Sequence, residues 1–335
     1  MNRTWKRAAG MLLAAAALAA AAIWSGWLPS PAGGGREAQP RMIFVIKSVD
    51  PTIEFWQVLQ DGIREAATEF GVRVEIVGPD NETDVEGQIR ILEQAASARP
   101  DAIVLAATEL NRLVPAARQA VEAGVELLTV DSGIEPDLAS TMIATDNVAA
   151  GKAAGSELLS MLDRPSQVAI ISFVRNSASQ LDREEGVKSV LAAHPDIELL
   201  GTYYSEGYEQ RAYETTLALL RAHPNLRGIV GLNEPSSVGA GRAIEEAGLV
   251  NQVKLIGFDS SDAEVRQLER GVMHATVIQK PFQMGYLSVK TALETLRGKR
   301  VPQRIDTGSV VVTKRNMYEE ENQKLLFPFV RRQLP

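Results

Sequence analysis

Seven pairs of polar residues follow short apolar runs in this chain, and their side chains suit hydrogen bonding to a small molecule. The pairs are Lys47-Ser48, Asp80-Asn81, Thr108-Glu109, Asp131-Ser132, Arg175-Asn176, Asn233-Glu234 and Asp259-Ser260. Carboxylates accept hydrogen bonds, ammonium and guanidinium groups donate them, and amide side chains do both. In an open α/β sheet, residues directly after the strands lie at the edge where such sheets bind ligands. The spacing therefore predicts a binding cleft lined by polar side chains.

Residues for nucleophilic or metal-assisted catalysis are scarce by comparison. The chain has no cysteine, which excludes disulfides, thiolate ligands and cysteine nucleophiles, and it has only three histidines. No nucleophile elbow, P-loop or H-E-x-x-H motif occurs. Gly239-Ala240-Gly241 resembles the start of a dinucleotide-binding motif, but Ile244 stands in place of the third glycine, inside a predicted helix. The sequence therefore predicts a binding protein with no cofactor or metal, rather than an enzyme.

The elements that position the polar pairs alternate between strand and helix. Met42–Ile46 is an apolar run too short for a helix, and an amphipathic stretch over residues 54–70 follows it. Further strands are expected at residues 72–77, 102–105, 127–130, 168–172, 198–203, 228–231 and 254–257, with helices between them. Apolar strands between helices indicate parallel sheets covered on both faces, and the pattern restarts after Asp146. We therefore expect an α/β fold of two similar doubly wound parallel-sheet lobes.

The first 40 residues have the layout of an export signal. The basic residues Arg3, Lys6 and Arg7 precede Ala8–Leu28, a stretch of 21 residues without charge. Small residues over 30–35 suit signal peptidase, yet the apolar stretch also reaches the roughly 20 residues that span a bilayer. A cleaved signal peptide and an uncleaved membrane anchor therefore both remain open, followed by a tether to about residue 40. Either one places the body on the periplasmic or extracellular side of the membrane.

The charge balance argues against a nucleic-acid partner. The chain has 35 Lys+Arg against 42 Asp+Glu, a formal net charge of −7. Without the three basic residues of the leader, the balance is 32 against 42, or −10. Phosphates bind to basic surfaces, so this acidic body is not expected to bind DNA or RNA.

Four segments, in this order and spacing, resemble the periplasmic ribose-binding proteins and their relatives, the type I sugar-binding receptors. The segments are Phe55-Trp56 with Asp61-Gly62, Ile143–Asn147 with Gly151-Lys152, Leu255–Asp259, and Ala275–Gln279. The resemblance extends from about Met42 to Thr313 and implies two lobes joined by a three-strand hinge, with the ligand between them. It places residues 41–145 and 281–307 in the first lobe and residues 146–280 and 308–335 in the second.

The resemblance also implies which side chains bind the ligand. They are Asp131, Arg183, Asn233, Asp259 and Gln279, the aromatic pair Phe55 and Trp56, and Tyr208 as an aromatic residue from the second lobe. Carboxylate, guanidinium and amide groups match the vicinal hydroxyls of a sugar, and aromatic faces cover its C–H side. Structural roles remain open for several of them. Asp131, Asn233 and Asp259 could cap helices, and Arg183 could form a surface ion pair with Asp182 or Glu184.

Lys47 departs from the family pattern, because a small polar residue is common at its position. The Asp-Arg pair of ribose-binding proteins is also replaced here by Asp131-Ser132. Two interpretations of Lys47 are open. The ammonium group could pair with Asp50 or Asp131, or it could bind the carboxylate of an anionic ligand such as a sugar acid.

The function implied by the resemblance is an exported, monomeric solute-binding protein that captures a sugar-like molecule by hinge closure. Its partner would be a membrane ABC permease, or alternatively a sensor histidine kinase of a two-component system. A more distant alternative is the ligand-binding core of a LacI-type repressor. That class requires an N-terminal helix-turn-helix, and an apolar leader occupies its place. A further alternative is an exported α/β hydrolase. Such an enzyme requires a nucleophile elbow, and this chain has none.

Overall fold

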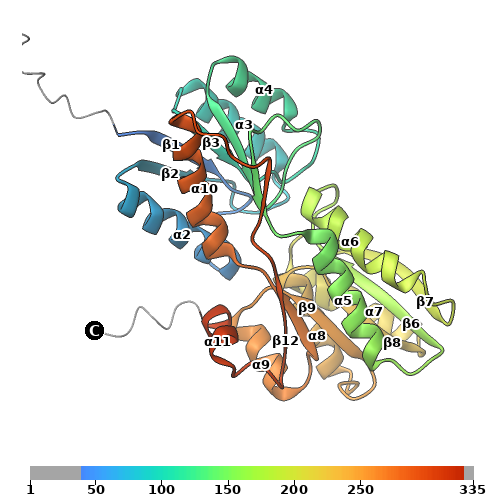
Figure 1. Cartoon of the computed structure of the whole chain (residues 1–335). Coiled ribbons are helices and arrows are strands. Elements are labelled where there is room, and N and C mark those ends of the chain that lie inside the picture. Colours follow the sequence, from blue (N-terminus) through green and yellow to red (C-terminus); the bar gives the residue numbers. More distant parts are fainter. Residues whose placement is uncertain (1–38, 328–335) are drawn as a thin grey trace, which may run out of the picture. The chain divides into compact units, whose positions relative to one another are not determined.

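The computed structural model describes residues 39–327, which form two α/β lobes, each built on one six-stranded sheet (Figure 1). The predicted signal peptide or anchor lies outside the described residues. The two lobes confirm the predicted fold class. Within residues 39–327, no helix is both long enough and apolar enough to cross a membrane.

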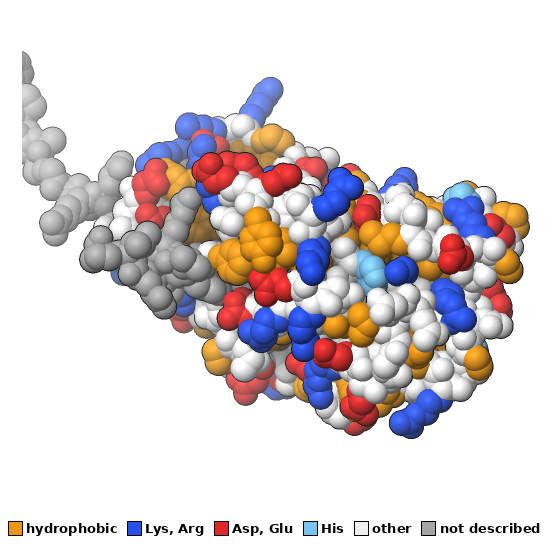
Figure 2. All heavy atoms as spheres, turned by 90° about the horizontal axis from the view of Figure 1, so that it is seen from below, with side chains coloured by type: hydrophobic (Ala, Val, Ile, Leu, Met, Phe, Trp, Pro, Cys, Tyr) orange, Lys and Arg blue, Asp and Glu red, His pale blue; other side chains and the backbone are white. Residues whose placement is uncertain are grey.

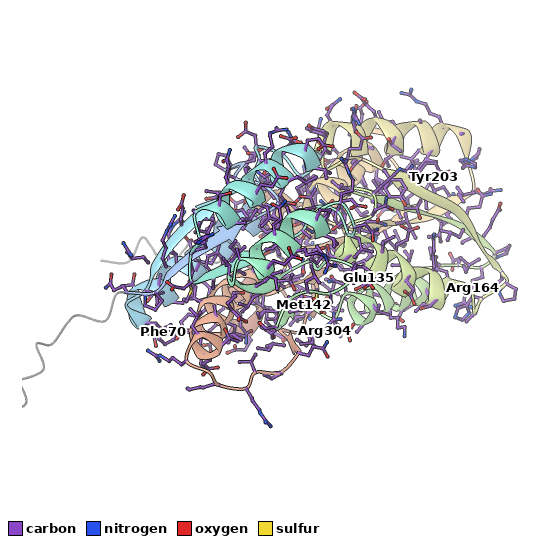
Figure 3. All side chains as sticks on the ribbon, turned by 90° about the horizontal axis from the view of Figure 1, so that it is seen from above. Phe70, Glu135, Met142, Arg164, Tyr203 and Arg304 are labelled. Carbon is purple, nitrogen blue, oxygen red and sulfur yellow. The ribbon has the colours of Figure 1, made fainter. Side chains whose placement is uncertain are left out.

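The first sheet is entirely parallel and has the strand order β11-β5-β4-β3-β1-β2. Its strands are β1 (Arg41–Val45), β2 (Arg73–Val77), β3 (Ala102–Leu105), β4 (Glu126–Val130), β5 (Met142–Ala144) and β11 (Arg304–Asp306). Arg304 of β11 pairs with Met142 of β5, and Figure 3 shows these two residues side by side. A strand from the C-terminal part of the chain therefore completes the edge of this sheet.

The second sheet has the order β12-β10-β9-β8-β6-β7. Its strands are β6 (Ser166–Ser172), β7 (Ile197–Tyr204), β8 (Leu226–Gly231), β9 (Lys254–Phe258), β10 (Ala275–Ile278) and β12 (Val310–Thr313). The edge strand β12 runs antiparallel to β10, whereas the other neighbours are parallel. β12 enters this sheet from β11 of the first sheet, only three residues earlier in the chain.

Helices cover both faces of each sheet. They are α2 (Glu54–Phe70), α3 (Val85–Ser97), α4 (Val114–Glu122), α5 (Asn147–Met161), α6 (Ala178–Leu191), α7 (Glu209–Ala222), α8 (Glu234–Glu246), α9 (Asp262–Arg270), α10 (Pro281–Leu296) and α11 (Glu320–Leu326). In the first lobe, Phe44 packs under α2 and α10, while its neighbours Ile43 and Val45 pack under α3 and α4. This alternation explains why β1 is apolar from Met42 to Val45, as a strand buried on both faces must be.

The chain passes between the two sheets three times: from β5 to α5, from β10 to α10, and from β11 to β12. Helix α10 packs with the first lobe, where Met284 joins the same core as Leu59 of α2. Our exact lobe boundaries, after residues 145, 280 and 307, stay a prediction. The passages matter for the site because they place the carboxyl ends of strands from both sheets around one cleft.

Candidate functional site

Eight of the nine side chains predicted to bind ligand line a single pocket between the two lobes. They are Lys47, Phe55, Trp56, Asp131, Arg183, Asn233, Asp259 and Gln279. Most of them stand just after a strand or in the first turns of the following helix. The structure therefore brings together residues that are up to 232 positions apart, between Lys47 and Gln279.

Tyr208 is the exception, because it lies outside this pocket. It occupies the N-cap position of α7 and is 43% exposed. Its ring lies under the guanidinium of Arg211, 5.6 Å from the ring centroid, and it lines a neighbouring cavity. That cavity shares lining residues with the first pocket, so Tyr208 lies beside the pocket without lining it; the shared residues are Ile53, Glu82, Glu234 and Pro235.

Asp131 and Asp259 occupy equivalent strand ends in the two lobes, after β4 and β9. Both have left-handed backbones, with φ of 61° and 78°. Such a conformation is uncommon for residues other than glycine, although aspartate tolerates it better than most. Neither residue caps the next helix, because Ser261 is the N-cap of α9 and no helix follows β4 directly. The capping alternative is therefore wrong for both, and both carboxylates line the cleft.

Asp131 forms a buried ion pair with Lys47. Their charged atoms are 2.8 Å apart, and the side chains are only 4% and 3% exposed. The ammonium of Lys47 also donates to the hydroxyls of Ser177 and Ser179, at 3.0 and 3.1 Å. Asp50, the other partner considered for Lys47, instead accepts from Thr52. The pairing with Asp131 is thus the one that forms.

Arg183 is buried and its guanidinium is held by two acceptors. Its Nε donates to Asn147 Oδ1 at 2.9 Å, and its Nη1 donates to the carbonyl of Leu232 at 2.7 Å. The guanidinium also lies 4.7 Å from the centroid of the Phe258 ring. With 2% exposure, Arg183 is not the surface ion-pair residue of the alternative interpretation.

Close packing of α5 against α6 sets the position of Arg183. A Cβ atom on Gly151 of α5 would overlap the Arg183 carbonyl oxygen, and one on Gly186 of α6 would overlap the carbonyl of Val148. The two glycines therefore allow the helices to approach at backbone distance. This close packing of the two helices holds Arg183 in its buried position.

Asp259 is the centre of a second hydrogen-bonded group. It accepts from Gln279 Nε2 at 2.6 Å and from the backbone N–H of Glu234 at 3.1 Å. Burial raises the pKa of Asp259, while the Arg183 charge and these two hydrogen bonds counteract the rise. Asn233 caps α8 through the N–H of Ser236, as the structural alternative supposed, and its side chain also lines the pocket.

The aromatic pair opens α2 at the pocket wall. The rings of Phe55 and Trp56 meet edge to face, with centroids 4.9 Å apart and planes at 87°. Trp56 Nε1 donates to Glu82 Oε1 at 2.8 Å, which fixes the indole. Both rings are largely buried, and both line the pocket.

Sequence reasoning missed several further lining residues, namely Ile53, Glu82, Phe173, Ser179, Glu234 and Pro235. Some of them had a usable signal. Phe173 directly follows β6, Glu82 follows the polar pair after β2, and Glu234 belongs to a polar pair that we had singled out. Burial raises the pKa of Glu82, and burial together with the charges of Asp259 and Glu54 raises the pKa of Glu234 to about 9.

The pocket therefore combines fixed acceptors, fixed donors and aromatic walls. Carboxylates, a guanidinium and amides face one space, which suits a ligand that carries several groups able both to donate and to accept. Among residues 39–327, no cluster of histidine and carboxylate side chains is arranged to hold a metal ion. The arrangement can bind and orient a polyhydroxylated ligand.

Comparison with known proteins agrees with this geometry. A model of the periplasmic binding protein domain matches residues 43–300. A D-ribose/D-allose-binding protein of Pseudomonas aeruginosa is 28% identical over 303 residues, covering 88% of this chain and 93% of that protein. A carbohydrate transporter solute-binding protein from Agrobacterium radiobacter, solved with D-arabinose, is 31% identical with a TM-score of 0.83, covering 87% and 99%.

A second solved structure leads to the same family. It is an ABC transporter solute-binding protein from Agrobacterium vitis with bound D-fucose, 33% identical with a TM-score of 0.82, covering 85% of this chain and 99% of that one. The resemblance to ribose-binding proteins drawn from the sequence motifs is thereby confirmed. With its two parallel-sheet lobes and the match over most of its length, the chain belongs to the periplasmic binding protein family.

Proposed function

We propose that this chain is an exported receptor that captures a neutral monosaccharide between its lobes and delivers it to a membrane ABC importer. One observation carries the proposal: polar side chains from both lobes converge with an aromatic pair on a single pocket. The names of similar proteins support it, since they bind D-ribose, D-allose, D-arabinose and D-fucose. The chain acts by binding, without catalysis.

Hinge closure would follow from the way the site is divided. Trp56 on α2 and Asp131 after β4 come from the lobe of the first sheet, and Arg183 on α6 and Asp259 after β9 come from the lobe of the second. A ligand that contacts both sets binds the closed form more tightly than the open form, and so shifts the population toward closure. Mismatched epimers would leave buried polar groups unpaired, which gives such a site its selectivity.

Delivery to a transporter is favoured over signalling by the same comparisons. Solved relatives are described as solute-binding proteins of carbohydrate and ABC transporters. No observation on this chain favours a sensor kinase as the partner. On the face seen in Figure 2, Lys and Arg side chains are interspersed with Asp and Glu, and this agrees with a protein that does not bind nucleic acid.

The proposal is tested by thermal unfolding of the chain with a panel of pentoses, hexoses, polyols and sugar acids. A ligand at 100 times its dissociation constant stabilises the folded state by about 2.7 kcal/mol. At this domain size, that corresponds to a rise in Tm of about 5–10 °C. The rise should vanish in Asp259→Asn and persist in Asp137→Asn, an exposed aspartate outside the pocket. A folded protein that shows no rise with any sugar contradicts the proposal.

A further inference from the structure

Lys47 has an ammonium group whose three protons are all used within the protein. Its Nζ lies 2.8 Å from Asp131 Oδ2, 3.0 Å from Ser177 Oγ and 3.1 Å from Ser179 Oγ. An ammonium group offers three donors and no acceptor. No N–H is therefore left for a ligand, even though Lys47 lines the pocket.

The charges around the pocket also disfavour an anionic ligand. Besides Asp131, the lining contains the carboxyl groups of Glu82, Glu234 and Asp259. The lining cations are Lys47 and Arg183, and the charge of Lys47 is matched by Asp131. Arg183 in turn lies close enough to Asp259 to lower the pKa of that carboxyl, so each lining cation already has an acidic neighbour and neither is left to bind a ligand carboxylate.

The partners of Lys47 belong to different lobes. Lys47 and Asp131 follow β1 and β4 of the first sheet, whereas Ser177 and Ser179 stand at the start of α6, after β6 of the second sheet. Ser177 occupies the N-cap position of α6, yet its hydroxyl makes no capping bond. Serine at an N-cap normally bonds to the helix backbone. Here the hydroxyl instead accepts from Lys47 across the cleft.

Other bonds join the lobes at the same rim. Ser132 Oγ lies 3.2 Å from Ser177 Oγ and accepts from the backbone N–H of Ser179 at 3.3 Å. The backbone N–H of Leu110 donates to the carbonyl of Asn176 at 2.8 Å. This rim is therefore held by direct contacts between protein groups.

From these contacts we infer that Lys47, Asp131, Ser177 and Ser179 form a cross-lobe latch. In this latch Lys47 is a positioning residue that stabilises the closed form, and it does not bind a charged group of the ligand. A buried ion pair overcomes its desolvation cost only with additional hydrogen bonds. Ser177 and Ser179 supply these bonds, and they reach Lys47 only when the lobes are closed. The inference rests on the proposed function, capture of a sugar by hinge closure, and it assigns Lys47 as a residue that controls hinge closure.

The latch predicts a closure defect that is independent of the ligand. Because the chain has no cysteine, labels can be attached at Arg118→Cys on α4 and Glu185→Cys on α6, two exposed sites in different lobes. The distance between the labels is then measured without ligand and with D-ribose, D-arabinose, D-fucose, D-galactose or D-galacturonate. The variants are Lys47→Met, the pair Ser177→Ala/Ser179→Ala, and the control Lys290→Met, an exposed lysine on α10.

In Lys47→Met, the closed fraction without ligand should fall. Affinity should weaken by roughly 10- to 100-fold for every sugar that binds, because two hydrogen bonds between the lobes, each with an ordinary net contribution, are lost. The loss should lie mainly in a faster dissociation rate, and the ratios of affinity between sugars should stay unchanged. The variant Ser177→Ala/Ser179→Ala should show the same loss of closed fraction and affinity. Combining it with Lys47→Met should weaken affinity little further, as expected for coupled residues. Lys290→Met should behave as the native protein.

Three results would overturn the latch: a loss confined to D-galacturonate, an unchanged closed fraction in Lys47→Met, or additive effects of the lysine and serine changes. If Lys47→Met does not fold, the serine pair alone decides, since it leaves the Lys47–Asp131 ion pair in place. If no sugar binds the native protein, the proposed function fails. The label distances without ligand then still decide whether the latch exists.

Discussion

Replacing Arg183 with methionine removes a buried cation but keeps much of the volume of its side chain. The change leaves two buried acceptors without their donor, Asn147 Oδ1 and the carbonyl of Leu232. A buried acceptor that loses its partner costs about 1–3 kcal/mol, so the two together predict a loss of about 2–6 kcal/mol in the free energy of unfolding. The variant also removes the charge that most strongly lowers the pKa of Asp259.

The assay is urea unfolding at pH 7, with Arg175→Met as the matched control. Arg175 is exposed and lies 3.6 Å from the ring centroid of Tyr204, so its loss should cost about 1 kcal/mol or less. Sugar binding should be abolished in Arg183→Met and retained in Arg175→Met. If Arg183→Met is as stable as the native protein, the reasoning about its two buried acceptors is refuted.

Three further predictions follow from the same contacts. Sugar affinity should fall as pH rises toward 9, by at most about tenfold per pH unit. Glu54 of the first lobe contributes to the raised pKa of Glu234, about 9 in this structure, so opening the lobes should lower that pKa and release protons. Calorimetry should show a flatter pH profile in Glu234→Gln. Gly151→Ala should destabilise the fold by about 1–3 kcal/mol and weaken sugar binding, because its Cβ overlaps the Arg183 carbonyl. Its control is Gly124→Ala at an open turn, where a titration should give an unchanged sugar affinity. Burial and the Lys254 charge lower the pKa of half-buried His274 to about 4. Between about pH 6.5 and 4 the unfolded chain therefore binds more protons than the folded chain, and stability falls as pH falls through this range. In His274→Gln, urea unfolding should show a decrease in stability that is about 1–2 kcal/mol smaller than in the native protein, after discounting for solvent screening.

Residues directly after strands were predictable because two local patterns act together. Apolar runs mark buried strands, and the carboxyl ends of parallel strands form the ligand edge of the sheet. Asp131, Asn233 and Asp259 were found in this way, and the family motifs added Arg183 and Gln279. The structure places all five around one pocket; their role in binding ligand stays a prediction.

Contacts across the cleft could not be predicted, because they depend on how two lobes meet. Nothing local links Lys47 to Ser177, which is 130 residues away, or shows that Ser177 would leave its helix uncapped. The three-residue strands β5 and β11 are too short to give a periodic signal. Tyr208 was predicted as an aromatic residue from the second lobe, but its place after a strand gives no information on which way its ring points; it lies outside the pocket, and its role in binding stays a prediction.

Calorimetric titration of the chain with D-ribose, D-allose, D-arabinose and D-fucose tests the central claim most directly. Capture in a single interlobe pocket predicts that at least one of them binds with one site per chain and a negative heat-capacity change, as burial of the ligand requires. The same titration should give no heat of binding in Asp259→Asn. Heat from none of these sugars in a folded native protein, or unchanged binding in Asp259→Asn, would contradict the account.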